Sequence, residues 1–584
     1  MSRTRLIVTT GLVVACLAAL LPTHTRAQGP AGVVDAALTA QMASAGEASY
    51  LVYMKESANL SQVSAITDRD AQGWAAYNAL TSVATRTQGP LLAYVRQPGR
   101  ASFVKSFFSA NVVGVTSNAA TLAAVAGFPE VDHITLAPVV QIPEPTPGVE
   151  EARVNAVEWN IAKVRAPDAW ARGFRGAGIV VANVDTGVLY THAALVGKYR
   201  GNLGGGVFDH NYNWWDPSKI CGNPSNIPCD NNNHGTHTMG TMVGDDGGTN
   251  QIGVAPDAKW MACKGCESGN CSAFALLECG DWILAPWNLA HASPDPAKRP
   301  HIVNNSWGGG PGDAWYRTVV QNWRAAGIFP AFSNGNSGPG CGTSGSPGDY
   351  PESFASGATD INDNIAGFSS RGPSAFGPVK PDIATPGVNI RSSVASGGYA
   401  SFNGTSMASP HTAGLVALIW SAFPTLVRDV ANTEKKLRPA TQILNTAAAC
   451  GGDGPRTHPN NAFGAGRGDA FRAINFFDVY TNQANYQAGD QFKTWISITS
   501  PQAAPLSADL YLFLRTPSNI QTFPLGNVVI APGTKLYDVS IANGIAPALP
   551  AGTYVWAAVA VAPGQDPMNA ANHLSLDVAV FRAP

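Results

Sequence analysis

Charged residues are scarce in this sequence and nearly balanced in sign. Asp, Glu, Lys and Arg make up 13% of its 584 residues, and the formal net charge is −2. This balance gives no electrostatic reason to expect binding to nucleic acid or to a membrane surface. Internal repeats and low-complexity tracts are absent as well. Abundant glycine, tryptophan and tyrosine instead indicate an exported globular protein with long ordered loops, of roughly three to four domain-sized units.

Long hydrophobic runs are also lacking, with one exception at the N-terminus. Two arginines precede an apolar run over residues 6–21, and small residues follow up to Ala27. This order is typical of a secretory signal peptide, so we predict that residues 1–27 are removed and that the protein is secreted, without a stable membrane span. A competing interpretation takes "VVAC" as a lipoprotein box with a lipid anchor on Cys16, but the apolar run continues beyond that cysteine.

Cysteine is the next scarce residue, with nine in the whole chain, of which Cys16 lies in the predicted signal peptide. An even number in the remaining exported chain favours disulfide bonds. Cys221 and Cys229 bracket a turn-rich segment and form the best candidate pair. Cys263 and Cys266 have the spacing of a zinc or redox motif, but the spacings that follow supply no clean second ligand pair. The sequence does not reveal how these other cysteines pair: Cys263, Cys266, Cys271, Cys279, Cys341 and Cys450.

The apolar pattern divides the rest of the chain into three parts. Within residues 28–150, residues of about 49–143 alternate short apolar runs with helical stretches, which predicts a small α+β domain ending in the proline-rich segment 142–151. Residues 151–478 alternate strongly apolar strands with helices, which predicts an α/β fold with a mostly parallel sheet and helices on both faces. Residues 479–584 alternate apolar and polar residues between turns, which predicts a C-terminal β-sandwich.

Three residues with chemical potential lie at boundaries of the α/β pattern. Asp185 ends the strand pattern "GIVVANVD", His234 opens "HGTHTMG", and Ser406 precedes a buried helix pattern in "NGTSMASPH". Each has an ordinary explanation, as a turn aspartate, a buried histidine or a helix N-cap. His234 and His237 also raise a metal site, but no acidic residue completes an HExxH motif, and we interpret His237 as structural. Together the three residues suit nucleophilic catalysis, because a hydroxyl needs a base and a carboxylate orients the imidazole.

The motifs "VDTG", "HGTH" and "GTSMASPH" resemble the three signature blocks of the subtilisin-like serine proteases, in the same order, over residues of about 160–475. Runs such as "VNNSWGGG" and "KPDIATPGVNIRSSV" further resemble the bacillopeptidase F-like branch of that family. The resemblance implies that Asp185 orients the base, His234 is the base and Ser406 is the nucleophile. In "SNGNSGPG", Asn336 matches the family's oxyanion asparagine, whose amide would join the Ser406 backbone N–H around the carbonyl oxygen.

The resemblance also implies how substrate binds and how activity is controlled. The run "NNSWGGG" is similar to the segment against which these proteases lay substrate as an added strand. Ser306, Trp307 and Gly308 are therefore expected to bind substrate through the main chain, and the Trp307 side chain to shape an apolar subsite. Residues 49–143 resemble the family's inhibitory propeptide, most clearly from "NVVGVTS" to "VDHITL". The resemblance implies that residues 28–150 are this propeptide and that the zymogen is cut between residues of about 143–157. The chemistry requires no cofactor; family members often bind calcium, but we assign no ligand cluster to it.

We therefore expect a secreted serine endopeptidase that hydrolyses peptide bonds through an acyl-enzyme intermediate. Its partners would be protein or peptide substrates and its own propeptide, which acts as an intramolecular inhibitor. Two alternatives stay open. A catalytically silent protease-like scaffold would present residues 479–584 as an adhesive or binding domain. A related hydrolase or peptidyl transferase would use the same triad on an ester or with an amine acceptor, because all of these share the acyl-enzyme.

Overall fold

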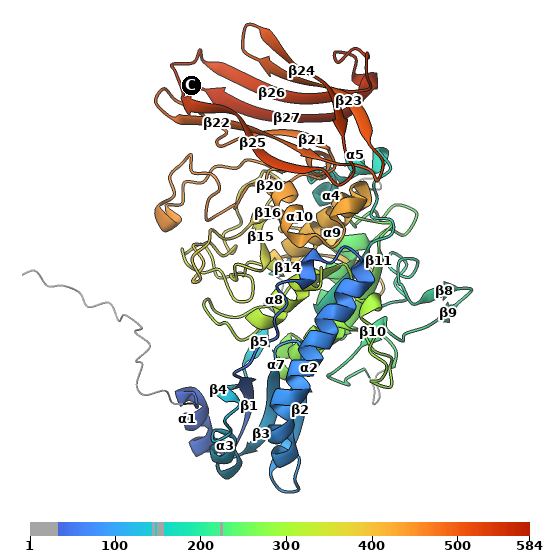
Figure 1. Ribbon diagram of the computed structural model, residues 1–584, viewed down its shortest axis with the longest axis vertical. Helices are drawn as coiled ribbons and strands as arrows, with labels where there is room; N and C mark the ends of the chain where they lie inside the picture. Colours follow the sequence, from blue (N-terminus) through green and yellow to red (C-terminus); the bar gives the residue numbers. More distant parts are fainter. Residues whose placement is uncertain (1–32, 143–145, 149–156, 222–225) are drawn as a thin grey trace, which may run out of the picture.

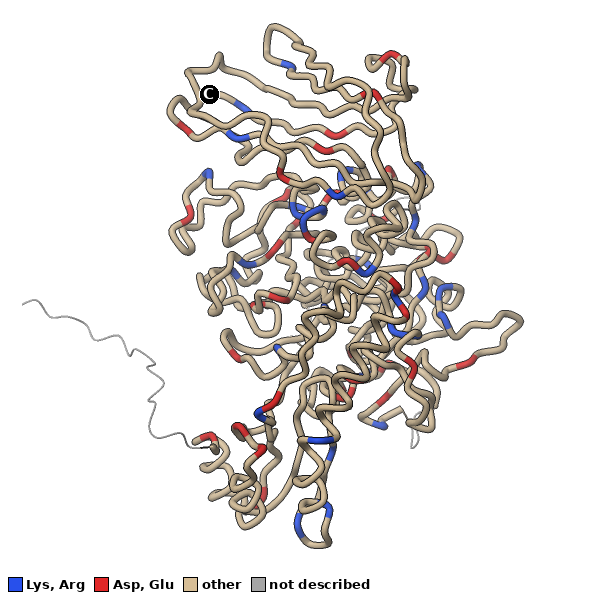
Figure 2. The backbone as a smooth tube through the Cα atoms, in the orientation of Figure 1, with Lys and Arg blue, Asp and Glu red and all other residues tan. Residues whose placement is uncertain are grey.

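The computed structural model describes residues 33–142, 146–148, 157–221 and 226–584. Three parts follow one another along its long axis, with the N-terminal elements at the bottom and the C-terminal strands at the top of Figure 1. Charged residues of both signs are spread over all three parts (Figure 2). None of the described helices combines the length and the apolar character needed to cross a membrane. The predicted signal peptide, with Cys16 and Ala27, lies outside the described residues.

The N-terminal part is a four-stranded antiparallel sheet, with the long helix α2 lying along it (Figure 1). The side chain of Asp68 caps α2 by accepting the N–H groups of Asp70 and Ala71. Apolar side chains of α2, such as Leu91 and Val95, pack on Val113 and Val115 of the sheet. In the strand order β2-β3-β1-β4, the elements are α1 (Ala36–Ala45), β1 (Glu47–Met54), α2 (Arg69–Val95), β2 (Ala101–Phe107), β3 (Val112–Asn118), α3 (Ala119–Val125) and β4 (Val131–Leu136).

The central part contains a nine-stranded sheet. Its neighbouring strands pair in parallel except for β19 and β20, which pair antiparallel. The predicted α/β fold with a mostly parallel sheet is therefore confirmed for this part. In spatial order the strands are β10 (Trp214–Trp215), β11 (Lys259–Lys264), β7 (Val180–Asp185), β13 (Ile302–Asn305), β14 (Phe329–Ser333), β15 (Phe354–Thr359), β16 (Ile383–Pro386), β20 (Arg467–Gly468) and β19 (Thr441–Gln442).

Helices cover both faces of this sheet. Successive strand residues point to opposite faces, so each strand packs on helices of both layers. Val181 and Ile302 pack in the same cluster as α6 and α9, whereas Ala182 and Val303 pack with α7 and α8. The helices of the central part are α4 (Trp159–Lys163), α5 (Ala166–Ala171), α6 (His234–Val243), α7 (Ala273–Leu284), α8 (Arg317–Ala325), α9 (Thr405–Ala422), α10 (Val430–Leu437) and α11 (Ala470–Ala473).

The C-terminal part consists of two antiparallel sheets, and strand β21 of one contacts β26 and β27 of the other. Its first strand begins at Phe477, just ahead of the predicted boundary at residue 479. The three-stranded sheet contains β21 (Phe477–Thr481), β22 (Gln491–Thr499) and β25 (Lys535–Ile545); the four-stranded sheet contains β24 (Ile520–Ile530), β23 (Leu506–Arg515), β26 (Gly552–Val561) and β27 (His573–Ala583).

All eight cysteines beyond the predicted signal peptide form disulfide bonds. The predicted pair Cys221–Cys229 is confirmed. Cys263 and Cys266 have the spacing of a zinc motif but form disulfide bonds with two different cysteines. The disulfide interpretation is therefore the correct one. The remaining bonds, which the sequence left open, are Cys263–Cys279, Cys266–Cys271 and Cys341–Cys450.

Candidate active site

The predicted acid and base meet at the edge of the sheet where its parallel strands end. Asp185 is the last residue of β7, and His234 is the first residue of α6. His234 Nδ1 lies 2.7 Å from Asp185 Oδ1, and both side chains are buried. The carboxylate also accepts hydrogen bonds from the Thr186 N–H at 2.7 Å and from the Thr238 hydroxyl at 3.3 Å. Because Nδ1 donates its hydrogen to the carboxylate, the lone pair of the imidazole is on Nε2.

The Nε2 atom of His234 is buried and has no hydrogen-bond partner among the residues that the structure describes. Helix α6 packs against α9, and Ser406 is the second residue of α9. The Ser406 hydroxyl donates to the Ser306 carbonyl at 3.1 Å, and the Ser306 hydroxyl donates to the Ser406 carbonyl at 2.9 Å. The structure thus joins Asp185 to His234 directly and places Ser406 at the start of the neighbouring helix, with its hydroxyl turned toward Ser306.

Asn336 lies beside the start of α9. Its Oδ1 atom accepts hydrogen bonds from the Thr405 N–H at 2.9 Å and the Thr405 hydroxyl at 2.7 Å, which leaves the amide nitrogen for another acceptor. A Cβ atom placed on Gly404 would lie 3.4 Å from Asn336 Nδ2 and 3.6 Å from the Ser406 nitrogen. The same point lies 3.5 Å from Met407 Sδ. The Asn336 amide nitrogen and the Ser406 nitrogen therefore lie on the same side of Gly404.

Residues 139–142 lie as an added strand next to this site. Strand β5 (Val139–Gln141) pairs antiparallel with β12 (Asn270–Ser272). On its other side, Gly308 donates its N–H to the Gln141 carbonyl at 3.4 Å. The next N–H, of Ile142, donates to the Gly269 carbonyl at 2.8 Å. The main chain of the central part thus holds an extended segment from both sides.

A few residues further along the chain, residues 146–147 contact the strand that leads into Ser406. Strand β6 (Thr146–Pro147) pairs with β18 (Tyr399–Asn403), and the Asn403 amide donates to the Thr146 carbonyl at 3.1 Å. Most of the predicted cleavage range of about 143–157 lies outside the described residues.

The three residues predicted to bind substrate differ in what they contact. Gly308 bonds the added strand, whereas the main-chain carbonyl of Ser306 accepts the Ser406 hydroxyl. The Trp307 indole is 0% exposed and packs against the rings of Tyr316 and Phe332, at centroid distances of 5.2 and 5.9 Å. With residues 139–142 in place, this side chain lies in the buried cluster of the α7 and α8 face, which also contains Val140 and Ile142 of the added segment. The apolar subsite expected from Trp307 stays a prediction.

Sequence analysis missed three features of the site. Strand β12 lacks an apolar pattern that would have indicated its pairing with residues 139–141. Asp230 accepts hydrogen bonds from the N–H groups of Asn232 and Asn233, and the cluster "DNNN" before His234 was an available turn signal. Lys264 is buried at the end of β11, and a single lysine at a strand end carries no signal of that burial.

The metal interpretation of the two histidines finds no support in their contacts. His237 is fully buried, and its Nε2 donates to the Ile390 carbonyl at 2.8 Å. Burial lowers the pKa of His237 to about 3, so this ring stays neutral and serves the packing of α6. The Nδ1 atom of His234 is hydrogen-bonded to the Asp185 carboxylate. Within the described ranges, no three His, Cys, Asp or Glu side chains form a group that could hold a metal ion.

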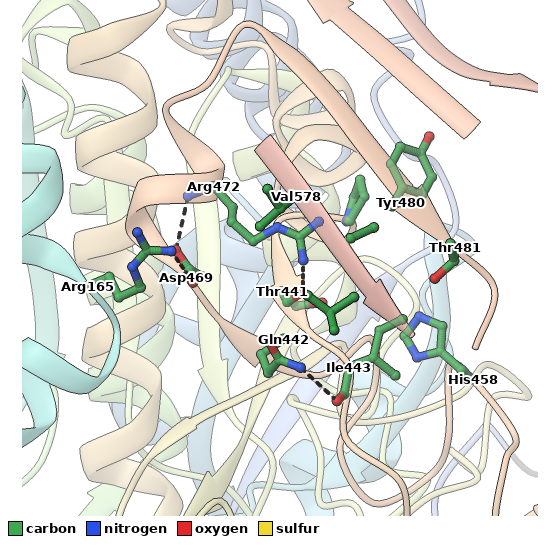
Figure 3. Close-up of a pocket in the computed structure, with 13 residues that line it drawn as sticks. Arg165, Thr441, Gln442, Ile443, His458, Asp469, Arg472, Tyr480, Thr481 and Val578 are labelled. Carbon is green, nitrogen blue, oxygen red and sulfur yellow. Dashed lines mark hydrogen bonds and ion pairs between the residues drawn. The ribbon is translucent and has the colours of Figure 1, made fainter. Parts of the chain in front are cut away.

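A pocket elsewhere in the molecule shows that cavity shape alone does not identify the site. It lies between the central part and the C-terminal strands, where Thr441 and Arg472 face Val578 (Figure 3). Arg472 donates to the Thr441 carbonyl at 2.7 Å, and Arg165 pairs with Asp469 at 3.4 Å. Protein partners already satisfy these charged groups, so we assign no ligand to this pocket.

Comparison with known proteins identifies a family model that falls within the central part. The family model of the subtilase family matches residues 176–466. Bacillopeptidase F of Bacillus subtilis (strain 168) is 40% identical over 422 residues, which cover 69% of this chain and 28% of that protein. Subtilisin Savinase of Lederbergia lenta is 34% identical over 270 residues, 46% of this chain and 86% of that protein. Subtilisin E of Bacillus subtilis (strain 168) is 32% identical over 274 residues, 46% of this chain and 62% of that protein.

Proposed function

Because the chain belongs to the subtilase family of serine-type endopeptidases, we propose that it hydrolyses peptide bonds with a triad of Asp185, His234 and Ser406. The 2.7 Å bond between the buried His234 and Asp185 side chains carries this proposal. A carboxylate that holds one imidazole nitrogen fixes the tautomer and stabilises the imidazolium that forms during reaction. The other nitrogen is then suited to act as a general base.

In the proposed reaction, the Ser406 hydroxyl turns from the Ser306 carbonyl to His234 Nε2. The base takes the hydroxyl proton while Oγ bonds the scissile carbonyl carbon, which gives a tetrahedral oxyanion. The protonated His234 then donates its proton to the leaving amine, and the C–N bond breaks to leave an acyl-enzyme on Ser406. Water, deprotonated by His234, attacks this ester and releases the acid, which restores the hydroxyl.

The oxyanion would be stabilised by two donors, the Asn336 amide and the Ser406 N–H. Support comes from the place of both nitrogens, which lie on the same side of Gly404. Ser406 also lies in the first turn of α9, where the helix dipole favours negative charge. Donors fixed in this way before the reaction need no reorganisation when the charge develops.

We propose that residues 28–150 are an inhibitory propeptide and that substrates bind as residues 139–142 do. Both β12 and Gly308 already bond this segment through the main chain, which is the mode of added-strand recognition. Backbone bonds of this kind suit many protein or peptide sequences, because they do not involve side chains. While the segment stays bound, it blocks the place where substrate would lie.

We further propose that the protein is secreted after loss of residues 1–27, with lipid attachment at Cys16 as the competing route. Residues 479–584 would form a β-sandwich, which the contacts of β21 with β26 and β27 support. The proposed steps use side chains, backbone N–H groups and water, so no cofactor takes part in them.

The decisive experiment compares the full chain without its signal peptide with its Ser406→Ala form. We expect the unaltered protein to lose about residues 28–150, to react with a serine-directed fluorophosphonate and to cleave peptides. Loss of the nucleophile is expected to lower kcat by roughly 10⁶-fold. Mass spectrometry, active-site labelling and peptide hydrolysis measure the three outcomes.

Ser421→Ala is the matched control, because Ser421 lies on the same helix and donates to the Leu418 carbonyl at 2.8 Å. It should process and label like the unaltered protein. If the unaltered protein neither labels nor cleaves while it is folded, the silent-scaffold alternative replaces this proposal. Acyl transfer to an added amine in preference to water would instead identify a peptidyl transferase.

A further inference from the structure

A buried lysine lies beside the aspartate of the proposed triad. Lys264 is the last residue of β11, and the parallel register of β11 and β7 places it opposite Asp185. Its side chain is fully buried. Lysine is rarely buried completely, because the loss of hydration must be offset by paired acceptors. The partners of Lys264 therefore indicate why it is there.

Three oxygen atoms surround the Lys264 amine. Nζ donates to the Thr186 carbonyl at 2.6 Å, to Asn231 Oδ1 at 2.7 Å and to the Cys266 carbonyl at 3.1 Å. An ammonium has three hydrogens to donate, whereas a neutral amine has only two. Three acceptors thus match the charged form.

The charge of Lys264 is balanced by carboxylates from the surrounding elements. Burial lowers the pKa of Lys264, and it is raised in turn by Asp230, Asp216, Glu267 and Asp185. Asp185 ends β7, Asp216 follows β10, Asp230 precedes α6 and Glu267 precedes β12. The ammonium is therefore the positive centre of an acidic surrounding that includes the triad carboxylate.

Two of the bonded groups belong to the two segments that carry the acid and the base. Thr186 follows Asp185 in the chain, and Asn231 lies in the turn before His234. Asp230 links the same two segments, because its Oδ1 accepts the Thr186 hydroxyl at 2.8 Å. The Thr186 hydroxyl oxygen in turn accepts the N–H that follows His234, that of Gly235, at 2.9 Å.

We propose that Lys264 is a positioning residue of the triad: it ties the Asp185 strand to the turn before His234, and it places a fixed positive charge beside their hydrogen-bonded pair. The inference rests on the proposed protease function. A positive charge at this place repels a positive charge on the nearby imidazole, so its removal should change the pH profile of the enzyme. The tie also limits the distance over which acid and base can separate.

The test measures kcat and KM for a peptide substrate from pH 5 to 9, with enzyme concentration set by fluorophosphonate titration. Lys264→Met removes both the positive charge and the hydrogen bonds to Thr186 and Asn231, whereas Lys264→Arg keeps the charge. Lys259→Met removes a charge from the exposed start of the same strand. For Lys264→Met we expect kcat to fall about 10²-fold with little change in KM. The acid limb of its pH profile should move to higher pH. Lys264→Arg should have a lower kcat, with its acid limb at the same pH as in the unaltered enzyme. Lys259→Met should match the unaltered enzyme in both respects.

A Lys264→Met enzyme with unaltered kcat and acid limb overturns the proposal, and so does an equal loss in both Lys264 variants with an unmoved limb. If Lys264→Met does not fold, as judged by circular dichroism, Asn231→Ala tests the same tie from the exposed turn. It should lower kcat several-fold without moving the limb, and an unaltered kcat overturns the tie. Failure of the unaltered protein to hydrolyse any peptide contradicts the protease function itself, so the two failures are distinguishable.

Discussion

At the scale of single residues, Asp185 and His234 show what a motif can and cannot reveal. Each was predicted from its place at a strand end or a helix start, and the structure joins them at 2.7 Å. Their supporting residues were not predictable in the same way. Lys264 lies far from Thr186 and Asn231 in the sequence and meets them only because β11 pairs with β7.

Asn336 provides a prediction at this scale. Replacement by alanine removes the free amide donor, so the developing oxyanion would keep only the Ser406 N–H. We expect kcat for peptide hydrolysis to fall about 10²–10³-fold with little change in KM. Steady-state kinetics, normalised by active-site titration, measure this loss.

Thr405→Val is the matched control for that prediction. It removes the hydroxyl that donates to Asn336 Oδ1 at 2.7 Å but leaves the amide nitrogen in place. Its loss of kcat should be clearly smaller than that of Asn336→Ala. A kcat within a few-fold of the unaltered enzyme for Asn336→Ala would assign the oxyanion donors elsewhere.

At the scale of elements, helix α7 of the central part contacts the N-terminal part. Asp281, near the C-terminal end of α7, is buried and accepts the Ser109 N–H at 2.7 Å and the Phe108 N–H at 3.2 Å. Both donors belong to the turn between β2 and β3. Burial raises the pKa of Asp281 to about 7, since a charged carboxylate is poorly solvated there.

This raised pKa predicts a pH dependence of stability. The carboxyl group holds its proton more tightly in the folded chain than in the unfolded chain, so its stabilising effect is complete below about pH 4. The effect is lost as pH rises toward about 7, at about 1.4 kcal/mol for each unit of pKa difference. In the uncut Ser406→Ala chain, Asp281→Asn should therefore raise the unfolding temperature near pH 8 but change it little near pH 4. Calorimetry over this range measures the difference, and parallel curves for the two chains would contradict the prediction.

At the scale of the whole molecule, the C-terminal strands share a core with the central part. Leu415 and Trp420 of α9 belong to one buried cluster with Leu510 and Phe581 of the C-terminal sheets. Helix α9 also carries Ser406 at its start. The C-terminal part is thus joined through one buried cluster to the helix that carries the proposed nucleophile, and its strand β25 contacts α10, which argues against a loosely tethered module.

A buried ion pair tests whether the C-terminal strands and the central part unfold together. Arg472 of α11 donates to Asp577 of β27 at 3.0 Å, and Asp577 also accepts the Val479 N–H at 3.0 Å. Asp577→Ala leaves the buried guanidinium without its main partner and should destabilise the fold by about 3–5 kcal/mol. The double variant Arg472→Met with Asp577→Leu should recover most of this loss, because it removes both charges. Thermal unfolding measures both, and an unchanged midpoint for Asp577→Ala would mean that the C-terminal strands unfold independently.

The sequence by itself determined the alternation of strands and helices, the acid, base and nucleophile candidates, and the pair Cys221–Cys229. These follow from local signals, since apolar period, turn residues and short motifs act over a few neighbouring positions. Only the tertiary structure decided the other disulfide pairs, the burial of Trp307, the pairing of residues 139–141 with β12 and the place of Lys264 beside Asp185. The physical reason is that sheet order and helix packing bring together groups far apart in the chain, and no local pattern records which of them will meet.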